Sequence, residues 1–462
     1  MENKQKLRPF GFRDKSSYMI GNIGCDLMFF LSSMYLLKFY TDVMGVSAAI
    51  VGSMMMISRF VDAFTDVTMG QIVDRAPTKA KGKFAPFIRM VAGPVAIASF
   101  LMYASWFKDM GMTFKVVWMF ATYLLWGSVF YTGINIPYGS MASAITDSPK
   151  ERAELSKWRT IGTQLVLILT SVVLPSFIYY KNEAGQNVLS DKNMMIAAAI
   201  FSVVAFIAFM VCYHMTTERV KFETKTEKFD LIGLLKSLAT NKALLGIVLV
   251  SLTALLGQMS YQSMQNYIYP NYFGNASGIA MTNLIGIGIT LFVATFVVKL
   301  SDKFGRKNLA IFSAVIQAAS FIALYFIQTD NIWVWTVIFE IGFIGSGIFS
   351  LITWAMLADV IDDTEVVQGE RADGTVYSVY SFSRKCGQGF SSGIAGAMLS
   401  MIGYTAATAY NPEVVKGIYD VTCLVPAASY VLLTLAVIFL YPLSKKRVEA
   451  NTAELRRRRA AK

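Results

Sequence analysis

The sequence predicts an all-α membrane protein with twelve transmembrane helices in two six-helix halves. Three observations support this: the composition, the recurrence of long apolar segments, and a loop pattern that appears once in each half. Of the 462 residues, 55% are hydrophobic and 16% are charged, whereas soluble globular domains carry about 25% charged residues. The composition therefore excludes an ordinary soluble domain.

The apolar segments are long enough to act as transmembrane helices, because crossing the hydrocarbon core takes about 20 residues. A hydrophilic stretch rich in Lys and Glu separates the first six from the last six. We expect an N-terminal half over 1–215, a cytoplasmic middle loop over 216–241, a C-terminal half over 242–444 and a basic cytoplasmic tail over 445–462. The twelve predicted spans are 17–40, 47–73, 86–107, 115–145, 156–180, 193–215, 242–266, 278–300, 308–328, 332–358, 375–401 and 417–442.

A similar hydrophilic loop follows the second and the eighth predicted spans. In the first half it contains Asp74 and Arg75, and in the second half it contains Asp302 and Arg306. The two loops lie about half the chain apart, which is the organisation of transporters built from two repeated halves. We expect these charged residues to cap helix ends or to pair nearby, and so to latch the cytoplasmic side.

Basic residues gather in alternate loops, and this predicts the orientation. Lys and Arg are frequent before the first span, after the even-numbered spans and in the tail, and they are absent from the first and several other odd-numbered loops. The positive-inside rule then places both termini in the cytoplasm. The net charge of +12 is therefore explained by the cell membrane, and we do not expect nucleic-acid binding. The run Arg456–Arg459 is expected to lie near anionic lipid.

Three charged residues inside the second predicted span need an explanation, because a charge at the bilayer centre costs about 2.5–3.5 kcal/mol. Asp62 and Asp66 are four residues apart and share a helix face, and Arg59 precedes Asp62 by three. One interpretation is an internal salt bridge that allows the helix to insert. The other, which we favour, is a cation or proton site, because one arginine neutralises one of two carboxylates. The coupling ion, proton or sodium, stays open.

Seven stretches of the chain form motifs that carry a family resemblance: 24–26, 59–70, 82–87, 135–140, 356–362, 377–387 and 441–446. Together they resemble the glycoside–pentoside–hexuronide:cation symporters of the major facilitator superfamily, the family of the melibiose permease. The run around Arg384 and Lys385 is especially similar to the glucuronide and xyloside permeases. The resemblance covers the whole chain.

The resemblance implies site residues one by one. For the cation it implies Asp62 and Asp66, with polar groups at Thr65 and Thr132. For the sugar it implies Asp26, Arg159 and Lys385. This chain has Asn135 where the melibiose permease has an aspartate, Gly139 where that protein has its stacking aromatic residue, and Cys25 where it has a basic residue. Galactoside specificity is therefore not implied.

The chemistry of these residues suits a sugar, since carboxylates accept hydrogen bonds from hydroxyls and a guanidinium donates in a fork. Asn135 belongs to the expected cation and substrate sites, and Tyr138 and Tyr377 are expected to contact the sugar. Two roles stay open for Lys385: a structural pair with Asp26 or Asp62, or capture of a substrate carboxylate.

We therefore expect cation-coupled symport of a glycoside, a glucuronide or a β-xyloside, by alternating access. A lipid or lysolipid transporter on the same fold is the alternative, and a sensor without net transport is a third. No enzyme motif is found, and no cofactor is expected. The expected partners are the sugar and membrane lipid, and we expect the protein to be a monomer. The expected cytoplasmic gate comprises Asp74, Arg75, Arg152, Asp302, Arg306, Asp359, Asp362 and Arg371.

Overall fold

The computed structural model describes residues 8–79, 81–220, 241–369 and 373–460, without the side chains of 368, 373–375, 377, 378, 459 and 460. The chain folds into two compact units, residues 1–229 and 230–462, which are described one at a time. Most of the expected middle loop, 221–240, lies outside the described residues.

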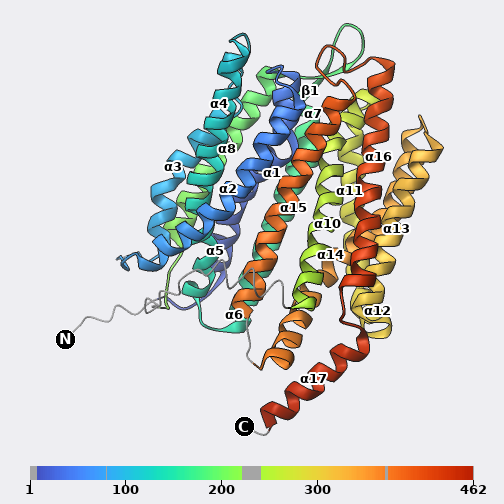
Figure 1. Cartoon of the computed structure of the whole chain (residues 1–462). Helices are drawn as coiled ribbons and strands as arrows, with labels where there is room; N and C mark the ends of the chain where they lie inside the picture. Colours follow the sequence, from blue (N-terminus) through green and yellow to red (C-terminus); the bar gives the residue numbers. More distant parts are fainter. Residues whose placement is uncertain (1–7, 80, 221–240, 370–372, 461–462) are drawn as a thin grey trace. The chain divides into compact units, whose positions relative to one another are not determined.

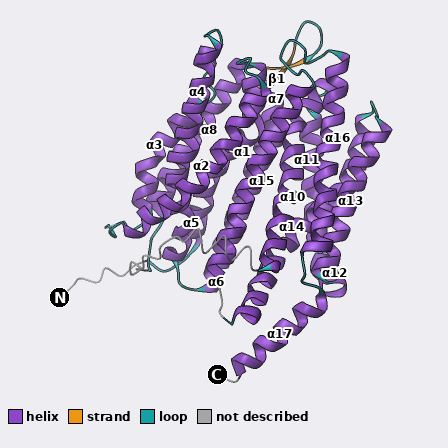
Figure 2. Ribbon diagram, in the orientation of Figure 1, coloured by secondary structure: helices purple, strands orange, loops and turns teal. Residues whose placement is uncertain are grey.

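The first unit is helical apart from one short hairpin (Figures 1 and 2). Short polar residues and prolines set several helix starts, as expected from the unpaired N–H groups there. Ser190, for example, accepts a hydrogen bond from the Asn193 amide at 3.1 Å. The elements are α1 (Phe12–Asp42), α2 (Ala48–Arg75), α3 (Ala85–Leu101), η1 (Ser105–Phe107), α4 (Met112–Leu124), η2 (Leu125–Tyr131), α5 (Thr132–Ile145), α6 (Pro149–Ile168), η3 (Leu169–Val173), α7 (Leu174–Ile178), β1 (Tyr179–Lys181), β2 (Asn187–Leu189) and α8 (Asp191–Met215).

Helix α1 is the centre of the first unit, because it packs along both α6 and α8, while α2 packs against η2 and α5. Large side chains such as Trp126 and Tyr35 are fully buried between these helices. Phe64, Ile97 and Val117 are exposed at 61–63%. Large apolar side chains on the outer faces are the pattern of a helix bundle that lies in lipid.

The second unit repeats the helical plan and adds a tail helix. Asn241 starts α10 by accepting bonds from the amides of Ala243 and Leu244, both at 3.0 Å, and Asn331 starts α14 in the same way. The elements are α10 (Lys242–Tyr267), η4 (Ile268–Tyr272), α11 (Gly278–Ala294), α12 (Val297–Phe304), α13 (Arg306–Ile327), α14 (Ile332–Gln368), α15 (Asp373–Met401), α16 (Pro412–Leu435), η5 (Ala436–Leu440) and α17 (Lys445–Ala460).

Helix α10 packs along α15 and α16, and α13 packs along α14 and α16. The tail helix α17 packs against α14. The residues that line a cavity in this unit come from α10, α13, α14, α15 and α16, so the packing of these five helices positions them.

All twelve predicted spans are helical, which confirms the all-α class. Among the described residues, ten helical segments are long and apolar enough to cross a membrane. The bent pair α11 and α12, with an angle of 55°, makes an eleventh if it counts as one span. The remaining expected span, 375–401, forms α15, which is 29 residues long but is not among these segments. It carries Arg384, Lys385 and Gln388 together with several serines.

Candidate functional site

Two carboxylates on α2 face two hydroxyl groups on the neighbouring helical run. Ser128 Oγ lies 2.6 Å from Asp62 Oδ1, and Thr132 Oγ1 lies 2.8 Å from Asp66 Oδ1. Ser128 belongs to the π-helical turn η2 and Thr132 begins α5, so both pairs are one turn apart along their helices. Such π-turns are frequent at functional sites, since they offset side chains from the regular helical positions. The arrangement gives a ladder of oxygen atoms inside the first unit.

Arg59 binds the upper rung of this ladder. Its Nη1 lies 3.2 Å from Asp62 Oδ2, and its guanidinium also lies over the Phe29 ring at 5.4 Å. Asp62 is 5% exposed. Both Asp62 and Asp66 have further interactions within the described part of the chain. Closely spaced carboxylates inside a membrane-length helix are the groups that a monovalent cation or a proton binds.

The remaining expected cation ligands lie differently. Thr65 donates to the Asp62 backbone oxygen at 3.2 Å, so its hydroxyl hydrogen is not directed at a carboxylate. Asn135 is half-buried and hydrogen-bonds to none of the described residues. It follows Thr132 by three residues on α5, which places the two on the same helix face.

A second polar cluster joins α1 and α6 at mid-span. Thr163 Oγ1 donates to Asp26 Oδ2 at 2.6 Å, and Asn22 Nδ2 contacts both Asp26 and Thr163. Arg159 Nε donates to Asn22 Oδ1 at 2.9 Å. Asn22 therefore bridges the two expected sugar residues, Asp26 and Arg159, which form no ion pair with each other. The Arg159 side chain is exposed within a span, so its donors are accessible to a ligand.

Tyr138 does not offer a ring face to a ligand in this structure, contrary to our expectation. It is 1% exposed, stacks on Tyr18 with ring centroids 4.7 Å apart, and donates to the Tyr18 backbone oxygen at 2.6 Å. The Arg159 guanidinium lies 5.8 Å from the Tyr138 centroid. The tyrosine pair thus packs beneath Arg159.

The loop after α2 is held by a residue that the motif does not include. Glu218, which follows α8, accepts hydrogen bonds from the amides of Lys83, Phe84 and Ala85 at 2.6–3.0 Å. Lys83 Nζ donates to the Asp74 backbone oxygen at 2.9 Å. The carboxylate of Asp74 and the guanidinium of Arg75 form no ion pair with the described residues, so of the two roles expected for them, capping or pairing, the structure does not show pairing.

In the second unit, the arginine of the corresponding loop does form an ion pair. Arg306 pairs with Asp359, which joins the start of α13 to α14. The Asp302 backbone oxygen accepts from Lys445 Nζ at 2.6 Å. The neighbour Asp363, rather than Asp362, receives a fork from Arg447 at 2.8 and 3.0 Å.

Two further residues, Arg152 and Arg371, belong to the expected gate. Arg152 donates to the Thr146 backbone oxygen at 3.0 Å, within the first unit. Arg371 lies outside the described residues, and the side chain of Tyr377 is likewise not described.

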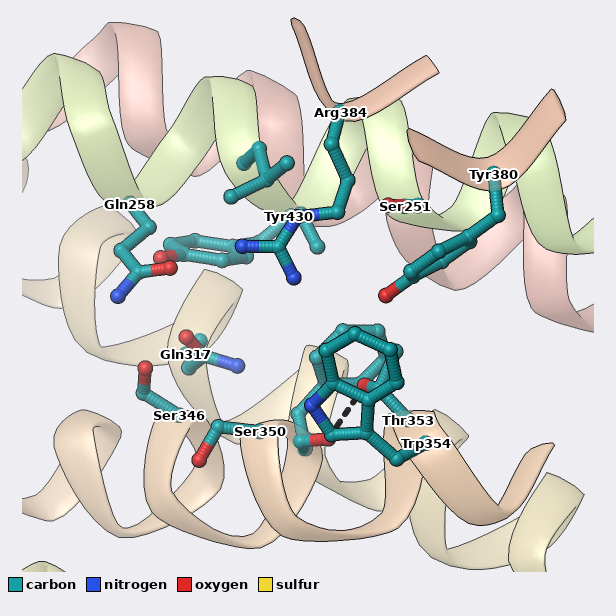
Figure 3. A pocket seen from close by; sticks show the side chains of 13 residues that line it. Ser251, Gln258, Gln317, Ser346, Ser350, Thr353, Trp354, Tyr380, Arg384 and Tyr430 are labelled. Atoms are coloured by element: carbon teal, nitrogen blue, oxygen red, sulfur yellow. Dashed lines mark hydrogen bonds between the residues drawn. The ribbon is translucent and has the colours of Figure 1, made fainter. Parts of the chain in front are cut away.

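A cavity of about 270 Å³ lies within the second unit. Figure 3 shows the Arg384 guanidinium directed into it, between Gln258 and Tyr430 on one side and Trp354 and Tyr380 on the other. Lys385, the expected ligand residue, does not line this cavity. Adjacent residues point to different faces of a helix, so the structure places the neighbour of the expected residue in the cavity.

Sequence reasoning missed Asn22, Ser128, Glu218 and the role of Arg384. Asn22 is four residues before Asp26, a spacing that predicts a shared face. Ser128 gave no such signal, because it faces Asp62 through a π-turn rather than through regular spacing. Glu218 and its partners are separated by more than 130 residues, and no local pattern connects them.

Two helical units, with charged and polar side chains held inside membrane-length helices, define a multi-pass membrane transporter. The family model described as MFS/sugar transport protein matches residues 17–445. The chain therefore belongs to the MFS/sugar transport protein family, and it is a transporter and not an enzyme.

Similar curated proteins span nearly the whole chain. The uncharacterized symporter YjmB of Bacillus subtilis (strain 168) is 32% identical, over 96% of this chain and 94% of its own. The glucuronide carrier protein homolog of Escherichia coli (strain K12) is 30% identical, over 96% and 95%. The isoprimeverose transporter of Lactiplantibacillus pentosus is 30% identical, over 92% and 88%.

The fold is also that of solved transporters. A bacterial homolog of the human lysosomal transporter Spinster, in an inward-facing and occupied conformation, superposes with a TM-score of 0.66 at 13% identity. The match covers 93% of this chain and 95% of the chain of that homolog. At this identity the likeness concerns the fold.

Proposed function

We propose that this protein carries out cation-coupled symport of a glycoside, a glucuronide or a β-xyloside, across the cell membrane by alternating access. The observation that carries the proposal is the ladder of Asp62 with Ser128 and Asp66 with Thr132. These are buried or half-buried carboxylates held one turn apart on α2, with hydroxyl oxygens opposite. Intramembrane ionisable residues are costly and are typical of ion and proton pathways.

The ladder suits a small monovalent cation or a proton. Among the described residues, no three His, Cys, Asp or Glu side chains gather as metal ligands. A sodium ion there would take hydroxyl or backbone oxygens in addition to the two carboxylates, whereas a proton needs one carboxylate. Binding of either adds positive charge beside the two carboxylates before the site closes, and this is how the ion and the sugar would favour each other reciprocally.

The cluster of Asn22, Asp26, Arg159 and Thr163 supplies the sugar contacts in the first unit. Its carboxylate and amide accept from hydroxyls, and the exposed Arg159 retains donors that the Asn22 bond does not use. The names of the relatives refer to a glucuronide, whose sugar carries a carboxylate, and to isoprimeverose, a disaccharide without one. These names support a glycoside as the substrate class.

A lipid or lysolipid transporter is the alternative, and polar side chains in both units weigh against it. In the first unit four polar side chains form one hydrogen-bonded cluster, and the cavity of the second unit is lined largely by Ser, Thr, Gln and Tyr. An acyl chain would leave such groups unpaired, which is unfavourable in an apolar environment. We further propose that both termini are cytoplasmic, on the strength of the basic loops.

Uptake of labelled glycosides into inverted or right-side-out vesicles tests the proposal. We expect accumulation when an inward proton or sodium gradient is imposed, and equilibration without it. Labelled lysolipid in the same vesicles is the comparison. Gradient-driven uptake of lysolipid with none of any glycoside would replace the proposal with its alternative.

A further inference from the structure

The cavity of the second unit has a charge that nothing around it balances. Among the described side chains that line it, Arg384 alone carries a formal charge; the others are hydroxyl, amide, aromatic or aliphatic. Arg384 is half-buried and forms no ion pair and no hydrogen bond with any described residue. The Arg384 guanidinium does lie over two aromatic rings. Its carbon is 5.8 Å from the ring centroid of Trp354 and 5.9 Å from that of Tyr380.

Such a guanidinium is poorly satisfied by the protein itself. Cation–π contacts contribute about 0.5–2 kcal/mol each, and they leave the N–H donors of the half-buried guanidinium to water or to a ligand in the cavity. Other arginines inside the helical units have acidic partners, since Arg59 pairs with Asp62 and Arg447 with Asp363. Arg384 therefore has donors available for an anion from outside the chain.

We propose that Arg384 binds the acid group of the transported sugar, so that the substrate is a glycoside bearing one carboxylate or sulfonate. This inference rests on the proposed function and narrows it, because a neutral β-xyloside would leave Arg384 unpaired. A planar guanidinium binds the oxygens of either acid group in a two-pronged fashion.

The rest of the cavity fits the sugar that would carry this acid. Trp354 is 51% exposed and presents an aromatic face, and its ring lies 5.6 Å from that of Tyr380. Gln258 and Ser350 are exposed in the same cavity and offer donors and acceptors for hydroxyls (Figure 3). No carboxylate among the described lining residues would repel an acidic ligand.

The inference also separates Arg384 from Lys385. Both residues carry a positive charge on α15, but Lys385 has other interactions among the described residues and does not line the cavity. Selectivity for the acid should therefore follow Arg384.

Calorimetric titration of the purified full-length protein in detergent tests this with two ligands, methyl β-D-glucuronide and methyl β-D-glucoside. They differ only in a carboxylate that replaces a hydroxymethyl group. We expect the wild type to bind the glucuronide at least about tenfold more tightly. Arg384→Gln should weaken glucuronide binding by about ten- to hundredfold, the range of a lost charge-assisted bond, and leave glucoside binding nearly unchanged. Arg384→Lys should recover part of the selectivity.

Control variants and a second ligand make the outcomes distinct. Lys416→Gln removes the same charge from an exposed site on α16 and should keep the wild-type selectivity. A glycoside with a sulfonate in place of the carboxylate should show the same dependence on Arg384. If Lys385→Gln, and not Arg384→Gln, removes the selectivity, or if the wild type binds both sugars equally, the inference is overturned while glycoside symport stands.

Failure of the underlying function would look different. If the folded wild type bound no glycoside in either form and vesicles accumulated none, the proposed function itself would fall. Should Arg384→Gln not fold, the wild-type preference between the two ligands still decides the matter, because equal affinity refutes a bound acid group.

Discussion

Asn135 places a neutral amide where the melibiose permease, which this chain resembles, has an aspartate. It lies one turn from Thr132 on α5, near the ladder formed with Asp62 and Asp66. A neutral amide supplies oxygen but no charge. Sodium prefers several hard oxygen ligands with negative charge, whereas a proton needs one carboxylate, and so we expect proton coupling or weak sodium coupling.

Asn135→Asp should therefore shift the protein towards sodium, because a third carboxylate raises the affinity for the ion by charge alone. The measurement is the sodium dependence of substrate binding at fixed pH, in the wild type and in the variant. Strong stimulation by sodium in the wild type that Asn135→Asp leaves unchanged would contradict this account.

Glu340 is a second residue whose surroundings predict a measurable effect. It is 6% exposed on α14, and both carboxyl oxygens lack a hydrogen-bond partner among the described residues. Glu340→Gln should raise the free energy of unfolding by about 1–3 kcal/mol, because the neutral amide removes the cost of burying a carboxylate charge without a partner. Thermal unfolding in detergent checks this, with the exposed Glu413→Gln as the control. A lower melting temperature for Glu340→Gln would show that the carboxyl makes a stabilising contact.

The two repeated loops, which follow the second and the eighth predicted spans, share a local structure. Each has a glycine in the left-handed region, Gly82 at φ +111° and Gly305 at φ +80°. In each unit, the chain that follows the last span covers that glycine. An added Cβ would lie 2.3 Å from the Glu218 carboxyl carbon at Gly82, and 2.8 Å from Lys445 Cβ at Gly305. The repeat in the sequence therefore corresponds to a repeated structure, a glycine turn that the chain after the last span of the same unit covers.

Glu218→Ala should weaken the first of these turns. It removes the acceptor for three amides at the start of α3, a capping loss of about 0.5–2 kcal/mol. The melting temperature in detergent should fall, and that of the exposed control Glu183→Ala should not. An unchanged melting temperature would mean that water replaces the carboxylate.

The same comparison has a pH dependence with a definite sign. Burial raises the pKa of Glu218 from its ordinary 4.5, against the opposing effect of the three amide bonds. The native state then binds the proton on Glu218 more tightly than the unfolded state does. The stability that Glu218 contributes is therefore greatest below the ordinary pKa and is lost as the pH rises through the raised pKa of the native state. The difference between the wild type and Glu218→Ala should shrink over that interval.

The tail helix α17 is the element whose role the sequence predicts least well. The run Arg456–Arg459 is expected to lie near lipid, whereas the contacts of the first turns of α17 were not expected: Arg447 and Asn451 both donate to Asp363 on α14, which is 3% exposed. Arg447→Gln should destabilise the protein by about 1–3 kcal/mol, because a buried carboxylate loses its charged partner. Arg456→Gln, in the exposed run, is the matched control. Equal melting temperatures for the two variants would contradict this role.

At the scale of the molecule, apolar length and repetition were sufficient to predict the helices, while the site was predicted only in part. Asp62, Asp66, Asp26 and Arg159 stood out because a charge inside an apolar segment needs a reason, and the structure brings each into a polar cluster. The partners Ser128 and Thr163 carry no such cost, so nothing in the sequence marks them. The choice between Arg384 and Lys385 depends on the rotation of α15 about its axis, which the order of the residues does not reveal.

The central claim is that the carboxylates of α2 couple an ion to the sugar. Its most direct measurement uses proteoliposomes containing the wild type, Asp62→Asn, Asp66→Asn or the exposed control Asp109→Asn. Each is assayed for accumulation of a labelled glucuronide under an inward proton or sodium gradient, and for exchange of the sugar without a gradient. A neutral amide cannot offset the charge of a bound cation, so both α2 variants should lose accumulation and keep exchange, while the wild type and the control retain both. Accumulation at the wild-type level by either Asp62→Asn or Asp66→Asn would contradict the account.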